Sequence, residues 1–205
     1  MLVKLDTDLS VIFGTQLFLR KQFLDPVTNA GLEKAVRSRA ATQPGVKVSN
    51  TGGWQSKPDL FDWPEPEVRK LAAELDRAIQ QFVSFGQAAP VPLKLYRAGW
   101  ANMNRAGDYN SLHNHPQQHL AAVYYVKASP LDGQGAPDGL LELRDPRPAA
   151  GVCGQPTLFS AHPVRIAPEP GMLVMFPGWI DHMVHPHHGP EERISLAINI
   201  KLADD

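Results

Sequence analysis

The chain has 205 residues, of which 43% are hydrophobic and 20% are charged, and its formal net charge is −1. This composition supports a packed core and excludes a largely disordered chain. A near-neutral chain lacks the basic excess of proteins that bind nucleic acid through bulk electrostatics. The longest apolar run, Leu120 to Val126, has seven residues, whereas a bilayer span needs about 20. We therefore expect neither nucleic acid nor a membrane as a partner.

The first ten residues contain acids and no long apolar stretch, which argues against a secretory signal peptide. The single cysteine, Cys153, has no partner for an internal disulfide. Both features predict a cytoplasmic protein.

The N-terminal part is predicted to contain a short strand, helices and a long loop. Apolar patches at 11–13 and 17–19 are suited to pairing at a sheet edge. Asn29 is a candidate N-cap for a helix that runs to about Ala41. The stretch 46–66 alternates Gly, Pro, Asn and Ser with two tryptophans. It is predicted to be an ordered loop that either wraps the core or forms a wall of a site.

The clearest predicted helix runs from Glu67 to Phe85. Apolar residues recur there at the i, i+3, i+4, i+7 spacing of one helix face. Pro66 lies near its start and Gly86 follows its end, as is common at helix termini. Because this helix has a single apolar stripe, we expect it to pack against a sheet.

From residue 91 the sequence changes to short strands separated by turn residues. The predicted strands are 93–102, 120–127, 140–143, 163–167, 172–176 and 193–202. Many short strands after a helical opening predict a mainly β fold, a sandwich or barrel with helices on one face. No change in composition divides the chain. We expect a single domain over 1–205, with 1–88 as a helical buttress and 89–205 as the β core.

All eight histidines lie after residue 100. His113 and His115 are two residues apart, and such residues project from the same side of an extended segment. His182 follows an apolar strand that ends in Pro177-Gly178. Three histidines from two separate strands suit one face of a metal ion, with its other positions left open. An H-x-H pair also occurs by chance, so the prediction depends on His182 joining it.

Arg193 and Ser195 share one face of the last predicted strand, opposite an aliphatic face made by Ile194, Leu196 and Ile198. A guanidinium group binds a carboxylate through two hydrogen bonds, and a hydroxyl group adds a further donor. The pattern therefore predicts an anion-binding face, although a salt bridge at a sheet edge would have the same residues.

The other histidines and the nearby acid need separate interpretations. We expect His185, His187 and His188 to be solvated residues of a hairpin rich in Pro and Gly. Asp181 is adjacent to His182 and points to the opposite face of an extended segment, so we expect it to orient a histidine rather than to bind metal.

The order of these parts resembles the iron(II)- and 2-oxoglutarate-dependent oxygenases, and more narrowly a bacterial family of 2OG-Fe(II) oxygenases without an assigned substrate. The matching stretches are SNTGGWQS, WANMNRAGDYNSLHNHP, VYYV, LELRDPR, PGMLVMFPGWIDHMVHP and ERISLAINI. This resemblance implies a double-stranded β-helix, which is a cupin-like jelly roll, with N-terminal helices packed on one sheet.

By this resemblance His113 and His182 correspond to the two histidine ligands of Fe(II), and His115 corresponds to the carboxylate ligand. His115 departs from the wider superfamily, which has Asp or Glu at this position. Three neutral imidazoles leave the iron centre one charge more positive than two imidazoles and a carboxylate.

The resemblance also implies the cosubstrate site and the reaction. Arg193 and Ser195 correspond to the pair that binds the far carboxylate of 2-oxoglutarate, and Tyr125 and Asn102 are further candidate contacts. The implied activity is oxygenation, most often hydroxylation, of a small-molecule or peptide substrate with release of succinate and CO2. No side chain is assigned a catalytic role beyond holding the metal and the cosubstrate.

Two alternatives remain open from the residues alone. One is a cupin-like metalloenzyme that has three histidine ligands and does not use 2-oxoglutarate. The other is a non-catalytic jelly-roll module that binds a metal or a small ligand. Arg193 and Ser195 on the inward face separate these alternatives, since neither has a special need for them. An edge strand or the 46–66 loop offers a surface for a homodimer.

Overall fold

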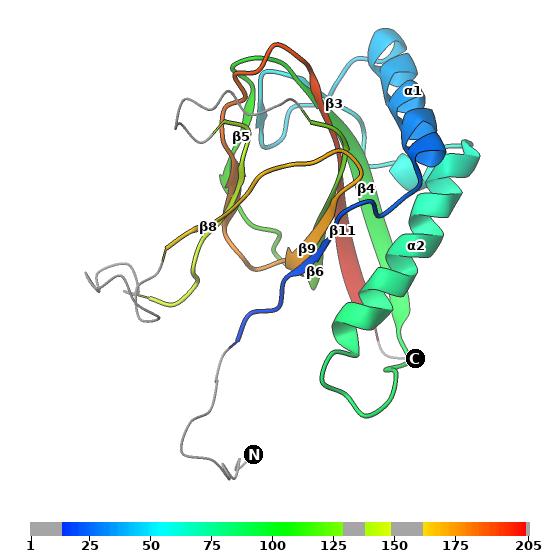
Figure 1. Cartoon of the computed structure of the whole chain (residues 1–205), viewed down its shortest axis with the longest axis vertical. Coiled ribbons are helices and arrows are strands. Elements are labelled where there is room, and N and C mark those ends of the chain that lie inside the picture. The colour runs from blue at the N-terminus through cyan, green and yellow to red at the C-terminus, as the bar shows by residue number, and fades with distance from the viewer. Residues whose placement is uncertain (1–13, 129–137, 149–161, 204–205) are drawn as a thin grey trace.

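The computed structural model describes residues 14–128, 138–148 and 162–203. The predicted patch at 11–13 and Cys153 lie outside these residues. Two antiparallel sheets face each other, and both helices lie on the outer side of the larger sheet (Figure 1). Within the described part of the chain, no helix is both long and apolar enough to cross a membrane.

The larger sheet contains six strands in the order β1-β9-β6-β11-β4-β3. They are β1 (Phe18–Arg20), β3 (Trp54–Gln55), β4 (Lys94–Asn104), β6 (Leu120–Lys127), β9 (Leu173–Pro177) and β11 (Arg193–Ala203). The edge strand β1 pairs with β9, which confirms the pairing predicted for the patch at 17–19.

The smaller sheet contains five strands in the order β2-β5-β10-β7-β8. They are β2 (Asn50–Thr51), β5 (Tyr109–His113), β7 (Leu141–Leu143), β8 (Val164–Ile166) and β10 (His182–Val184). All six strands predicted from the sequence are present, and the mainly β architecture of two facing sheets is confirmed. The short strands β2, β3, β5 and β10 were not predicted as strands.

Helix α1 (Pro26–Thr42) begins earlier than predicted. Asp25 is its N-cap, and the Thr28 backbone N–H donates to the Asp25 carboxylate at 2.9 Å. The prediction of Asn29 as the cap is wrong because Asp25 followed by Pro26 supplies both a capping acceptor and a φ suited to the first turn. Asn29 instead lies inside the helix, where its amide N–H donates to the Val126 carbonyl at 2.9 Å.

Helix α2 (Pro66–Val83) confirms the predicted amphipathic helix, and the short 3-10 helix η1 (Leu60–Asp62) precedes it. Its apolar stripe, which includes Leu71, Leu75 and Ile79, is fully buried. The aliphatic face of β11 belongs to the same core cluster as this stripe. Helices therefore cover the outer face of the larger sheet, and its inner face is left to build a site.

Leu75→Ala is expected to lower the free energy of unfolding by about 2–5 kcal/mol, because Leu75 is fully buried and its loss leaves a cavity. Chemical denaturation followed by circular dichroism measures this change. Arg77→Ala on the exposed face of α2 is the control, and we expect it to change the stability by less than about 0.5 kcal/mol. Equal effects of both changes would contradict the packing described here.

The register of β11 determines which residues face the smaller sheet. β11 pairs with β4 on one side and with β6 on the other. Ser195 lies opposite Asn102 on β4 and opposite Tyr125 on β6. Arg193, which is two residues away and on the same face, lies opposite Asn104. Polar residues of three neighbouring strands are thus gathered on one face.

Candidate functional site

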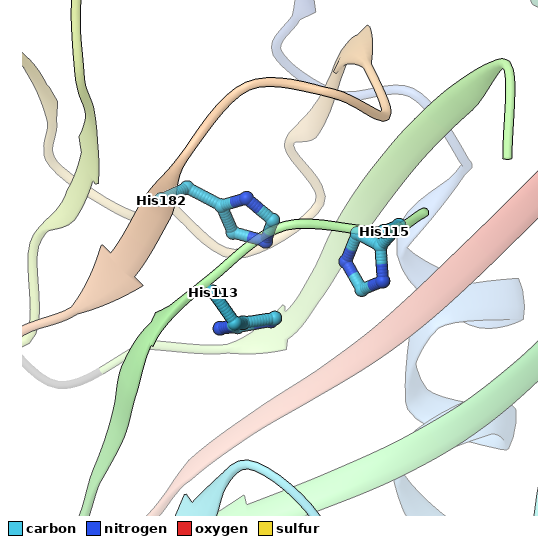
Figure 2. A group of neighbouring side chains, drawn as sticks. All are labelled: His113, His115 and His182. Atoms are coloured by element: carbon cyan, nitrogen blue, oxygen red, sulfur yellow. The ribbon is translucent and has the colours of Figure 1, made fainter. Parts of the chain in front are cut away.

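His113, His115 and His182 come together between the two sheets. Each offers one ring nitrogen, and these three atoms lie within 4.8 Å of one another. The ring centroids of His113 and His182 are 4.3 Å apart, and that of His115 is 5.0 Å from His182. Figure 2 shows the three rings turned toward a common point. Within the described residues this is the only cluster of at least three potential ligands that could hold a metal ion.

An irregularity in β5 places His113 in this cluster. His113 lies opposite His182 and Asn110 lies opposite Val184, so three residue steps on β5 face two on β10. This is the count of a β-bulge, which re-aims the side chains that follow it. As a result both Asn110 and His113 line the pocket.

Backbone carbonyls fix the orientation of two of the rings. His113 Nδ1 lies 2.6 Å from the Ser111 carbonyl oxygen, and His182 Nδ1 lies 2.8 Å from that of Ile180. Because a carbonyl only accepts, each Nδ1 carries the proton and donates it. Nε2 is then the unprotonated nitrogen, available to a metal ion.

Burial keeps two of the imidazoles neutral. It lowers the pKa of His182 to about 3, with the hydrogen bond to the Ile180 carbonyl acting in the opposite direction. Burial, together with the neighbouring His113, lowers the pKa of His115 to about 4. Both rings are therefore neutral at pH 7, and the neutral imidazole is the form that binds metal ions.

The backbone around His115 is tightly packed, although β5 ends before it. The His115 backbone N–H donates to the Gly178 carbonyl at 2.8 Å. A Cβ atom at Gly178 would lie 2.4 Å from the Gln118 carbonyl oxygen, so this close approach requires glycine. The His115 ring itself makes no hydrogen bond to any described residue.

Arg193 lines the same pocket as the three histidines, and its charge is buried without an ion-pair partner among the described residues. It is only 2% exposed, its Nε has no hydrogen-bond partner, and it forms no ion pair with any described residue. Burying a charge without a partner is costly. A buried guanidinium without an anion is therefore suited to an anionic ligand.

Other polar groups near Arg193 are also buried without partners. The Tyr125 hydroxyl and the side-chain oxygen of Asn102 have no hydrogen-bond partner among the described residues. The Arg193 guanidinium carbon lies 5.2 Å from the centre of the Tyr125 ring. Burial raises the pKa of Tyr125, with the neighbouring Arg193 acting in the opposite direction, so its hydroxyl stays protonated and can donate. Since buried polar groups are normally satisfied, this end of the pocket has the donors and acceptors of a polar ligand site.

Among families of related sequences, one model matches residues 98–199, about half of the 205 residues, and is described as "Putative 2OG-Fe(II) oxygenase". The matched segment contains the three histidines, Arg193 and Ser195. The chain belongs to this family of 2OG-Fe(II) oxygenases. No curated protein sequence matches the chain.

Solved structures similar to this oxygenase share its fold. A prolyl-4-hydroxylase from Pseudomonas putida is 17% identical with a TM-score of 0.66, and the match covers 90% of this chain and 91% of that one. A Trichoplax adhaerens prolyl hydroxylase is 15% identical with a TM-score of 0.65, covering 90% and 83%. HygX from Streptomyces hygroscopicus, with nickel and 2-oxoglutarate bound, is 13% identical with a TM-score of 0.59, covering 91% and 83%. The double-stranded β-helix predicted from the sequence is confirmed.

Every site residue predicted from the sequence lines one pocket of this oxygenase: Asn102, His113, His115, Tyr125, His182, Arg193 and Ser195. Sequence reasoning missed Trp100, Asn110 and Asn199, which line it as well. Trp100 and Asn199 lie on the inner faces of β4 and β11, and strand alternation from Asn102 and Ser195 would have found them. Ser49 also lines the pocket, so the 46–66 loop contributes to its wall.

The expectation that His185, His187 and His188 are solvated is wrong for His187. This residue is 3% exposed, and its Nε2 lies 2.6 Å from the Glu191 carbonyl oxygen. Its Nδ1 lies 3.5 Å from the carboxylate of the buried Asp138. His185 is partly buried beside Glu142, and only His188 is exposed. The segment packs inward because the carboxylates of Asp138 and Glu142, which are distant in the sequence, interact with His187 and His185.

Proposed function

We propose that this oxygenase holds Fe(II) on His113, His115 and His182 and binds 2-oxoglutarate between that metal and Arg193. The observation that carries the proposal is the buried, unpaired Arg193 in the same pocket as the three imidazoles. A metal site alone would have no need of a buried cation. A pocket that combines three metal-binding imidazoles with a buried cation matches what an iron-dependent enzyme with a dicarboxylate cosubstrate requires.

The donor set fits the metal. Imidazole is a suitable ligand for iron, and three ligands on one side leave positions open for other groups. With His115 in place of a carboxylate, the protein contributes no negative charge to the metal. No Asp or Glu is among the described residues that line the pocket, so the anionic cosubstrate would supply the neutralising charge.

The residues around Arg193 fit the cosubstrate. The guanidinium would bind the far carboxylate through two hydrogen bonds, and the Ser195 hydroxyl would donate a third. Tyr125 and Asn102 face Ser195 from the neighbouring strands. Their unpartnered polar atoms are suited to further contacts with the same ligand.

When bound, Fe(II) and 2-oxoglutarate supply the oxidising chemistry, in which dioxygen is activated and 2-oxoglutarate leaves as succinate and CO2. The chain's own residues bind, orient and shield these groups. Val123, Leu141 and Phe176 line the pocket with apolar surface that limits the access of water.

Hydroxylation of a peptide or a small molecule is the outcome that we propose. One similar structure is a prolyl hydroxylase in complex with a peptide fragment of hypoxia-inducible factor. Another is an α-ketoglutarate-dependent epimerase from nogalamycin biosynthesis. Both substrate classes therefore occur on this fold.

An anaerobic titration tests the proposal. Metal-free protein is titrated with Fe(II) and then with 2-oxoglutarate, and the visible charge-transfer band of the iron chelate is recorded. We expect the band to appear at one equivalent of each. Iron binding without the band would favour the cupin-like enzyme that does not use 2-oxoglutarate. Failure to bind iron would instead mean that the three histidines are structural.

A further inference from the structure

The three histidines are not held by the backbone to the same extent. His113 and His182 lie opposite each other on paired strands, and a carbonyl fixes each ring. His115 lies beyond the last residue of β5, outside the ladder, and no described residue hydrogen-bonds its ring. The position of His115 therefore depends on contacts made by the segment after β5.

A side-chain hydrogen bond joins the segment that carries His115 to the segment that carries His182. The amide N–H of Asn114 donates to the Asp181 carboxylate at 2.8 Å. Asn114 lies between His113 and His115, and Asp181 immediately precedes His182. We infer that the Asn114–Asp181 bond is a positioning contact that sets His115 against the other two ligands. This inference rests on the proposed metal site.

Asp181 is suited to position Asn114 because hydrogen bonds restrain the backbone of its own segment. Its carbonyl accepts the Arg144 backbone N–H at 2.9 Å. The preceding carbonyl, that of Ile180, accepts from the His182 ring at 2.8 Å. Since Asp181 is fixed, a bond to it fixes Asn114, and with Asn114 the backbone that carries His115.

The Asn114 contact acts together with a backbone contact. The His115 N–H bonds to the Gly178 carbonyl at 2.8 Å, which restrains the residue at one point only. The Asn114–Asp181 hydrogen bond restrains the segment at a second point, one residue earlier in the chain. It therefore limits rotation of the segment about the His115–Gly178 hydrogen bond. Hydrogen bonds that orient metal ligands commonly affect metal affinity by about 10–100-fold.

Both side chains are exposed, so an ordinary surface bond is the competing explanation. Such a bond would add little to stability and nothing to metal binding. The two explanations differ in the effect of exchanging the partners. In the double variant Asn114→Asp/Asp181→Asn, the amide and the carboxylate change places and the hydrogen bond can form again.

The experiment measures the affinity of the full-length protein for Co(II), together with the visible Co(II) absorption spectrum, at one fixed pH. We expect Asn114→Ala to weaken Co(II) binding about tenfold and to alter the spectrum. Asn114→Asp is expected to weaken it further, because two carboxylates then face each other. The exchanged double variant is expected to bind within about threefold of the unaltered protein.

Two reference variants make the result specific. Gln81→Ala removes an exposed hydrogen bond from Arg20 of 2.9 Å, far along the chain from the histidines, and we expect it to leave Co(II) affinity unchanged. His182→Ala is expected to lose Co(II) binding. Thermal unfolding of each metal-free variant checks that it is folded.

The outcomes separate the two levels of inference. If the unaltered protein binds Co(II), His182→Ala does not, and every Asn114 variant binds like the unaltered protein, the positioning role is overturned while the proposed function stands. The positioning role is overturned in the same way if the double variant shows no recovery of Co(II) affinity. If His182→Ala binds Co(II) as well as the unaltered protein, the metal site itself is wrong.

Discussion

Arg193→Met is expected to weaken 2-oxoglutarate binding at least about 30-fold, because truncating one partner of a buried charge pair typically costs about 2–5 kcal/mol. Methionine keeps much of the side-chain volume, so the change removes charge and donors with little loss of packing. Affinity for the metal alone, measured without 2-oxoglutarate, is expected not to fall, because the variant removes a positive charge from the pocket. The charge-transfer band and calorimetric titration provide the measurements.

The same variant has a second expected result that does not depend on activity. In the ligand-free protein the Arg193 charge is buried and has no carboxylate partner among the described residues, so its removal is expected to raise the melting temperature. The variant is also expected to lose the stabilisation that 2-oxoglutarate gives to the unaltered protein.

Arg97→Met is the matched control for Arg193→Met. Arg97 lies on β4, where it pairs with Asp76 and lies over the Phe61 ring, away from the pocket. It is expected to leave 2-oxoglutarate affinity unchanged. Undiminished turnover in Arg193→Met would rule out the proposed cosubstrate site.

His182→Ala is expected to reduce affinity for Fe(II) by more than the roughly 10–100-fold that loss of a supporting residue costs. Only the imidazoles of His113 and His115 would remain, because His182 is the one ligand of the three that β10 supplies. Turnover coupled to 2-oxoglutarate is expected to fall in proportion to the bound metal. Equilibrium dialysis with metal analysis measures the affinity.

His188→Ala is the control for that variant, since His188 is exposed. His187→Ala is unsuitable because His187 is buried beside Asp138, and its loss would disturb the fold. If His182→Ala and His188→Ala retain iron equally well, the proposed ligand set is wrong.

Strand alternation predicted the part of the site that β11 carries. Residues 193–201 place aliphatic side chains on one face of a long strand and, apart from Ala197, polar side chains on the other. The strand keeps one register against β4 along its whole length, although its register against β6 shifts between Ile194 and Ser195. The shared face of Arg193 and Ser195 therefore followed from the sequence alone. The amphipathic pattern likewise predicted α2, because a helix with a single apolar stripe can bury that stripe in only one orientation.

Other parts depended on tertiary contacts that a single sequence does not reveal. The bulge in β5 results from pairing with β10, and it changes which residues of 109–113 face inward. The burial of His187 results from a carboxylate that is distant in sequence, that of Asp138. The start of α1 was within reach, because Asp25-Pro26 is a stronger capping signal than Asn29.

The absence of acids among the described residues that line the pocket has a thermodynamic consequence for loading. A divalent cation and the Arg193 charge repel each other across the pocket, and a dicarboxylate between them relieves that repulsion. Each ligand therefore raises the affinity for the other by one common factor, as linkage requires. Metal retention then becomes a function of dicarboxylate concentration, and a protein washed free of the anion loses its cation more readily.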